Sequence, residues 1–108
     1  MLVATVQARY MAAIARTSDL EWQIQLITQS LMQMTNTTGA LFTLSADLEP
    51  ESPTYQSIMT RLNGIQMIEK SLSLQKQRIE QQYKALEKER DSLKSLLDKG
   101  VEQFKYLS

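Results

Sequence analysis

A seven-residue apolar repeat constrains the fold of this chain more than any other feature. From Val3 to Leu48, apolar or small side chains recur at alternating spacings of three and four residues, without a slip. This spacing places them on one side of a helix that packs along a seam against another helix. It predicts a helix over about residues 2–47, whose seam positions include Tyr10, Leu20, Ile24, Ile27, Leu31 and Leu41.

The predicted first helix is nearly free of charge. Between Met1 and Ala46 the charged residues are Arg9, Arg16, Asp19 and Glu21. A helix that is apolar on more than one side must be covered by more than one partner, so we expect lateral assembly. The outward apolar positions that we assign to an assembly interface are Met11, Ile14, Trp22, Leu26 and Met32. Trp22 is either an intersubunit anchor, because Trp is enriched at interface hot spots, or a partly exposed aromatic on its own helix.

One strong helix breaker divides the chain. Pro50 removes a backbone donor, and Ser52 followed by Pro53 is typical of an N-cap with proline at the first helical position. We therefore predict a turn at 48–53. Gly39 marks a weaker point, where a kink or short break of the first helix is a plausible alternative to a continuous helix.

A second repeat follows the turn and predicts a long helix over about residues 54–99 or beyond, with Gly100 as a candidate end. Its seam positions include Leu62, Ile65, Leu72, Ile79, Leu86 and Leu93. Glu69 and Lys76 also lie on this seam, either as a pair that sets the register or where the seam opens to solvent. Folding the two repeats about the turn places Leu41 by Leu62, Ala13 by Arg90 and Val3 by Gly100. The expected fold is an all-α antiparallel two-helix hairpin, a single domain over 1–108.

Composition excludes several function classes. The chain has no Cys and no His, and the charged run from Glu87 to Asp91 is scattered around one helix, so we expect no enzyme activity, cofactor or metal site. A formal net charge of zero argues against nucleic acid as the main partner. No apolar run is long enough for a transmembrane segment. Residues 1–15 lack the features of a cleaved signal peptide, so any export is expected to need no cleaved leader.

Parts of the second half resemble type III secretion needle proteins. The resemblance rests on the turn Glu49-Pro50-Glu51-Ser52-Pro53, the following Tyr55-Gln56-Ser57 and the tail Val101-Glu102-Gln103-Phe104. It covers about half of the chain, from the turn onward, and the first helix departs from it in being longer and more apolar. The packing of terminal helices into a Cys-free tube is similar to the terminal core of flagellins. The resemblance implies that Leu93, Leu97, Val101 and Phe104 are assembly residues, with a secretion machinery or chaperone as a partner. Folding the two repeats onto each other also leaves Phe104 and Leu107 beyond the start of the first helix, so we expect Leu107 to be an assembly residue as well.

These observations favour a structural, self-assembling subunit of a helical filament or tube, a homopolymer at the cell surface or outside the cell. The chief alternative is a coiled-coil adaptor or escort that forms a closed dimer or four-helix bundle, in the cytoplasm. A third possibility is peripheral membrane binding through residues 1–15. The scarcity of Lys and Arg on that helix weakens it.

Overall fold

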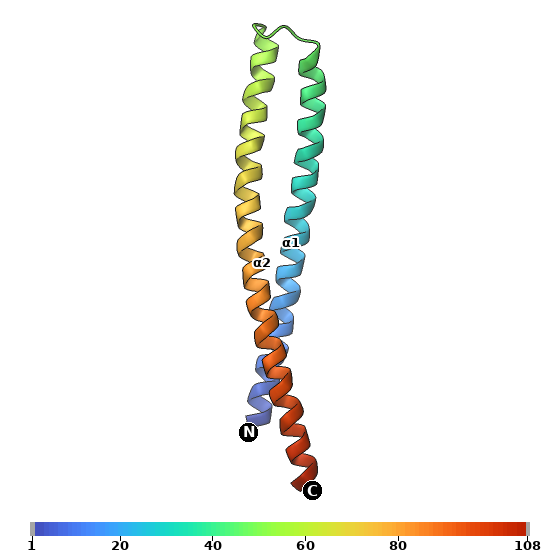
Figure 1. Ribbon diagram of the computed structural model, residues 1–108, viewed down its shortest axis with the longest axis vertical. Helices are drawn as coiled ribbons and strands as arrows, with labels where there is room; N and C mark the ends of the chain where they lie inside the picture. The colour runs from blue at the N-terminus through green and yellow to red at the C-terminus, as the bar shows by residue number, and fades with distance from the viewer. Residues whose placement is uncertain (1, 108) are drawn as a thin grey trace. The chain divides into compact units, whose positions relative to one another are not determined.

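The computed structural model describes the backbone of residues 2–107 and the side chains of residues 3–103. Two helices, α1 (Leu2–Ala46) and α2 (Pro53–Leu107), run antiparallel and are joined by the turn at 47–52 (Figure 1). The described residues contain no strand. The predicted all-α helical hairpin is therefore confirmed.

The helix ends differ slightly from the predicted ones. α1 ends one residue earlier than expected and runs unbroken through Gly39, whereas α2 continues past Gly100 to Leu107. Neither glycine has a positive φ, so both keep ordinary helical backbone. Packing along the apolar seam keeps both helices continuous at these glycines, although each glycine lowers the stability of its helix by about 1 kcal/mol relative to alanine.

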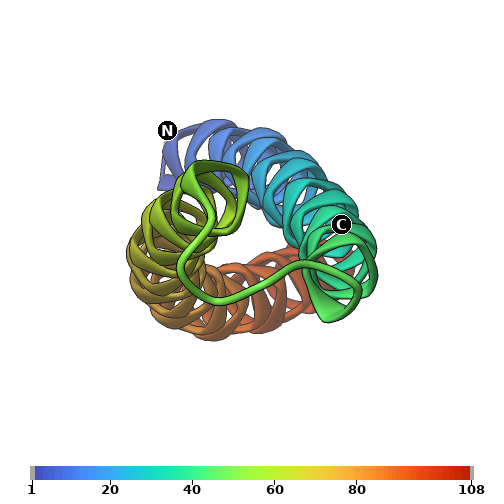
Figure 2. The same cartoon turned by 90° about the horizontal axis from the view of Figure 1, so that it is seen from above.

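The turn has the chemistry that its sequence predicts. The Ser52 amide donates to the Glu49 carbonyl at 3.0 Å, which places Pro50 at the second position of a turn, where its fixed φ is favourable. The Ser52 hydroxyl then accepts the Tyr55 amide at 3.1 Å, and the helix begins at Pro53. Ser52 is therefore the N-cap of α2, with Pro53 at the first helical position. Figure 2 shows this turn from above, where it joins the two helix ends.

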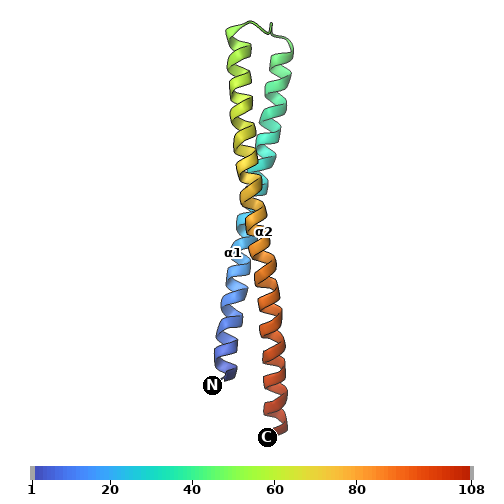
Figure 3. The ribbon, with the colours of Figure 1, turned by 60° about the vertical axis from the view of Figure 1, so that its left-hand side comes forward.

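Contacts within the chain group into two units. The terminal unit comprises Met1–Gln23 and Ile79–Ser108, and the turn unit comprises Ile24–Arg78. In each unit a segment of α1 lies beside a segment of α2, as the views in Figure 1 and Figure 3 agree. Each unit therefore has its own section of seam.

The seam of the turn unit is a small apolar cluster. Leu41 packs with Ile58 and Leu62, and partly buried Leu48, Met59 and Ile65 surround them. In the terminal unit the buried positions are Ala13, Thr17, Leu86 and Leu93. A Cβ added to Gly100 would lie 3.1 Å from Val3 Cγ2, which confirms the predicted approach of these two residues. The same register therefore holds in each unit.

Both cores are thin. Among the described side chains, six hydrophobic residues are buried, and each keeps between 3 and 9% of its surface exposed. In a pair of helices, each helix can cover only one stripe of the other, so most apolar side chains outside the seam remain in water.

Candidate assembly surface

The predicted seam residues line the contact between the helices in both units. Leu41, Leu62, Leu86 and Leu93 are buried, and the others are half-buried: Tyr10, Leu20, Ile24, Ile27, Leu31, Ile65, Leu72 and Ile79. Glu69 and Lys76 are also half-buried, and Lys76 borders a groove with Leu31, Met32 and Thr35. The side chains of the seam are thus buried or partly buried within the hairpin.

The charged residues of α1 gather beside α2. Arg9 forms an ion pair with Glu89 at 3.7 Å, and Glu21 accepts a hydrogen bond from the Tyr83 hydroxyl at 2.7 Å. Arg16 and Asp19 line a groove between the helices together with Leu86. Because all four charges flank the seam of the terminal unit, the outward face of α1 carries none.

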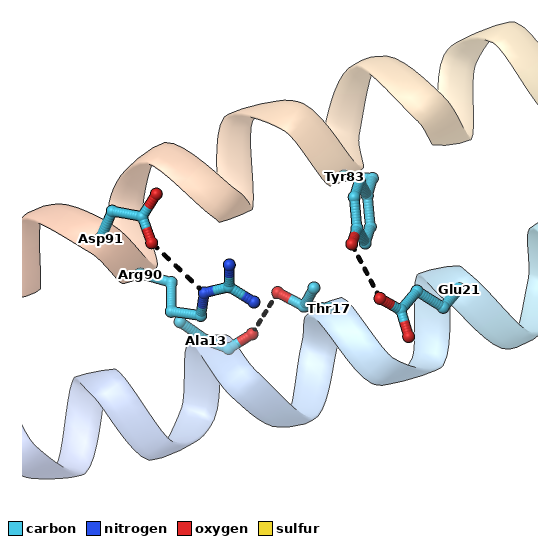
Figure 4. A network of polar contacts seen from close by, with 6 residues as sticks. All are labelled: Ala13, Thr17, Glu21, Tyr83, Arg90 and Asp91. Carbon is cyan, nitrogen blue, oxygen red and sulfur yellow. Dashed lines mark hydrogen bonds and ion pairs between the residues drawn. The ribbon is translucent and has the colours of Figure 1, made fainter. Parts of the chain in front are cut away.

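Tyr83 makes the best-defined polar contact between the helices (Figure 4). Its hydrogen bond to Glu21, desolvation and the nearby Glu87 together raise the pKa of the Tyr83 hydroxyl to about 12. The bond favours the neutral phenol because an ionised oxygen cannot donate to a carboxylate. This contact joins α1 and α2 beside the seam of the terminal unit.

Small residues of α1 accommodate a long side chain of α2 nearby. Figure 4 shows Arg90 extending from α2 toward α1, where Ala13 and Thr17 are both buried. The Thr17 hydroxyl donates to the Ala13 carbonyl at 2.7 Å, so its polar group is satisfied within its own helix. Arg90 Nε lies 3.6 Å from Asp91 Oδ1. Thr17 and Arg90 can therefore lie where the two helices pack closely, because each has a polar partner on its own helix.

The predicted assembly residues of α1 are exposed. Trp22 keeps 62% of its surface accessible, and Met11, Ile14, Leu26 and Met32 are also exposed. Ile14 and Leu26 keep 43% and 45% of their surface accessible, so part of each side chain is covered by the chain itself. Large apolar side chains gathered on an uncharged helix face are typical of a protein–protein contact.

The predicted assembly residues of the C-terminal tail have mixed environments. Val101 is exposed, whereas Leu97 is half-buried on the seam of the terminal unit. The side chains of Phe104 and Leu107 lie outside the described residues. Of the predicted assembly residues in the tail whose side chains are described, Val101 is therefore exposed and Leu97 is not.

Sequence reasoning missed a second group of exposed apolar residues. On α2 these are Met67, Ile68 and Leu74, and on α1 Phe42 adds to the exposed set. They lie off the heptad track, so the spacing that identifies the seam does not identify them. A search for a second three-and-four spacing on the outward side of α2 would have found Met67 and Leu74.

Neither a metal site nor a membrane-spanning helix is present among the described residues. No group of His, Cys, Asp or Glu among these residues could hold a metal ion. Neither helix, over the residues described, is long and apolar enough to cross a membrane. The outward helix faces are thus the most prominent unexplained surface.

Comparison with known proteins provides no relative for this chain: no family model, no curated protein and no solved structure matches it. The candidate site therefore rests on the residues and their geometry.

Proposed function

We propose that this protein is a structural subunit that assembles with copies of itself into a helical filament or tube. The observation that carries this proposal is the charge-free outward face of α1, on which Trp22 and Met11 each remain more than 60% exposed. Burying such side chains between copies is favourable by about 1.5–3 kcal/mol each. The thin internal cores give the chain a further reason to gain stability from neighbours.

The chemistry of the chain supports a mechanical role over a catalytic one. Catalysis needs groups that converge in a concave, dry site. Here the described charged side chains are mostly exposed, along two helices. A repeating contact that does not close on itself generates a filament without any further machinery.

The resemblance of the turn and tail to type III secretion needle proteins supports an exported filament. It also suggests a secretion machinery or chaperone as a transient partner. The competing proposal, a closed dimer or four-helix bundle, would cover the same face of α1 without polymer growth.

A concentration series separates these proposals. We expect light scattering to stay low up to a critical concentration and then rise, with uniform filaments in negative stain above that threshold. A constant dimer or tetramer mass at every concentration would instead identify a closed bundle. A monomer at every concentration would contradict self-assembly in any form.

A further inference from the structure

Two separate outward stripes of the chain contain no charged residue and carry large exposed apolar side chains, although Asp19 borders the first and Lys70 borders the second. The first, here called the α1 face, consists of Ala4, Ala8, Met11, Ala15 and Trp22 in the terminal unit. All five are exposed, and their spacing places them on one side of the helix. The second, here called the α2 face, consists of Thr60, Gly64, Met67, Ser71 and Leu74 in the turn unit. These residues are also exposed and recur at spacings of four and three.

The two faces have comparable lengths and complementary shapes, with large side chains on one and small residues on the other. At 1.5 Å per residue the α1 face extends about 27 Å and the α2 face about 21 Å. The α1 face offers the large side chains of Trp22 and Met11 between alanines. On the α2 face, a Cβ added to Gly64 would meet nothing within 4 Å, so open space lies over this glycine beside the 75% exposed Met67. Large groups on one face can therefore fit above small groups on the other.

Charge identifies the class of partner. An uncharged apolar face binds best to another uncharged face, because charged side chains would lose their hydration on contact. Exposed Arg61 and Lys70 lie at the edges of the α2 face. From Arg78 onward the exposed side of α2 carries many more charged residues, among them Lys84, Lys88 and Lys99, so that part is a poorer match. The chain has a formal net charge of zero, so its copies do not repel one another at long range. A second copy meets these conditions.

The accessible area of the chain is sufficient for such a contact. The chain exposes 8558 Å², whereas a compact monomer of 12.4 kDa is expected to expose about 6,100 Å². The excess of roughly 2,400 Å² is larger than the ~800 Å² that each partner buries in a standard interface. The chain can thus bury both faces and still leave a normal amount of surface in water.

We propose that the α1 face of one copy docks on the α2 face of the next copy, so that each subunit uses two different surfaces. This inference rests on the proposed self-assembly and names the surfaces that carry it. Pairing of two α1 faces would leave Met67 and Leu74 in water, whereas the α1-to-α2 contact covers both apolar faces. Because the two surfaces differ, the contact is heterologous and can repeat.

Two variants, each with a charge introduced into one of the two faces, test whether the α1 face of one copy binds the α2 face of another. Ala15→Lys places a charge in the α1 face and Met67→Lys places one in the α2 face, both at exposed positions where circular dichroism should show unchanged helix. Each variant alone should remain monomeric where the wild type assembles. Mixed in equal amounts, they should form a 1:1 heterodimer and nothing longer, because one intact face of each kind remains. Ser95→Lys, at an exposed position among the charged residues of α2, is the control and should assemble like the wild type.

The outcomes of this experiment are distinguishable. Homodimers of Met67→Lys alone would show that two α1 faces pair, and would overturn the inference while leaving self-assembly intact. Wild-type assembly with no heterodimer in the mixture would likewise overturn it. Wild-type chain that never associates would contradict the proposed function itself.

Two glycine substitutions provide a second, independent test. Gly64→Ala and Gly39→Ala each add a methyl group to an exposed helical glycine with nothing within 4 Å, so both should raise the melting temperature of the unassembled chain. Only Gly64→Ala fills space in the proposed contact, and it should raise the critical concentration about tenfold. Equal critical concentrations for the two variants would place Gly64 outside the interface and overturn the proposed fit.

Discussion

Threonine hydroxyls illustrate how an almost uncharged helix satisfies its polar groups. Thr17, Thr28 and Thr35 each donate to the carbonyl four residues earlier, at 2.7, 2.8 and 3.0 Å. Such bonds let threonine lie on or near a packed seam without an exposed charge. Thr38, in the turn unit, differs because its buried hydroxyl has no hydrogen-bond partner among the described residues.

Replacing that hydroxyl should stabilise the chain. Thr38→Val keeps the shape and the β-branch but removes an unsatisfied buried polar group, so we expect the free energy of unfolding to rise by about 1 kcal/mol. Urea denaturation of unassembled protein measures this change. Thr35→Val is the matched control, because it removes an exposed, satisfied hydroxyl and should have little effect. A loss of stability in Thr38→Val would indicate that the hydroxyl has an unrecognised partner.

The Tyr83 hydroxyl should lose its proton at a higher pH than an ordinary tyrosine, and the folded chain should lose stability as the pH rises through this range. The pKa of this hydroxyl is about 12 in the folded chain, against the ordinary tyrosine value of 10.0 that applies once unfolding breaks the bond to Glu21. The stabilisation is therefore complete below pH 10 and is lost as the pH rises from 10 to about 12. Ultraviolet absorbance of phenolate should show a late step that Tyr83→Phe removes. If Glu21→Gln leaves this step in place, the hydrogen bond is not its main cause.

At the level of the elements, the turn is defined by local chemistry. The Ser52 hydroxyl accepts the Tyr55 amide, which would otherwise lack an intrahelical partner. We expect Ser52→Ala to lower the free energy of unfolding by about 1 kcal/mol, whereas Ser52→Asp should retain most of it because a carboxylate also caps. Thermal unfolding followed by circular dichroism checks this. An equal loss in both variants would assign the effect to something other than the cap.

The helices also show which parts of an element can be predicted from sequence. The seam was predictable because heptad spacing determines the angular position of a side chain around its helix. Leu86 and Leu93 are buried as expected, whereas the continuity of α1 through Gly39 and of α2 through Gly100 was open. A glycine weakens a helix by an amount that packing against a second helix can outweigh, and the sequence alone does not reveal that balance.

For the whole molecule, assembly through uncharged faces has a distinct dependence on salt. Screening between about 0.1 and 1 M sodium chloride weakens ion pairs but not apolar contacts. We therefore expect the critical concentration not to rise over this range, and to rise on cooling, because hydrophobic association weakens at low temperature. Sedimentation of assembled protein at each condition measures both effects. Filaments that dissolve at high salt would instead implicate the charged side of α2.

The sequence by itself determined the class of fold, the turn and the seam, because these depend on spacing along each helix and on the chemistry of a few adjacent residues. It also identified Met11 and Trp22 as outward residues. Only the tertiary structure decided that the four charges of α1 flank α2 and that Met67 and Leu74 remain exposed. The physical reason is that exposure, ion pairing and the contact between Glu21 and Tyr83 depend on which side of each helix the distant partner covers. No repeat within one helix encodes that by itself.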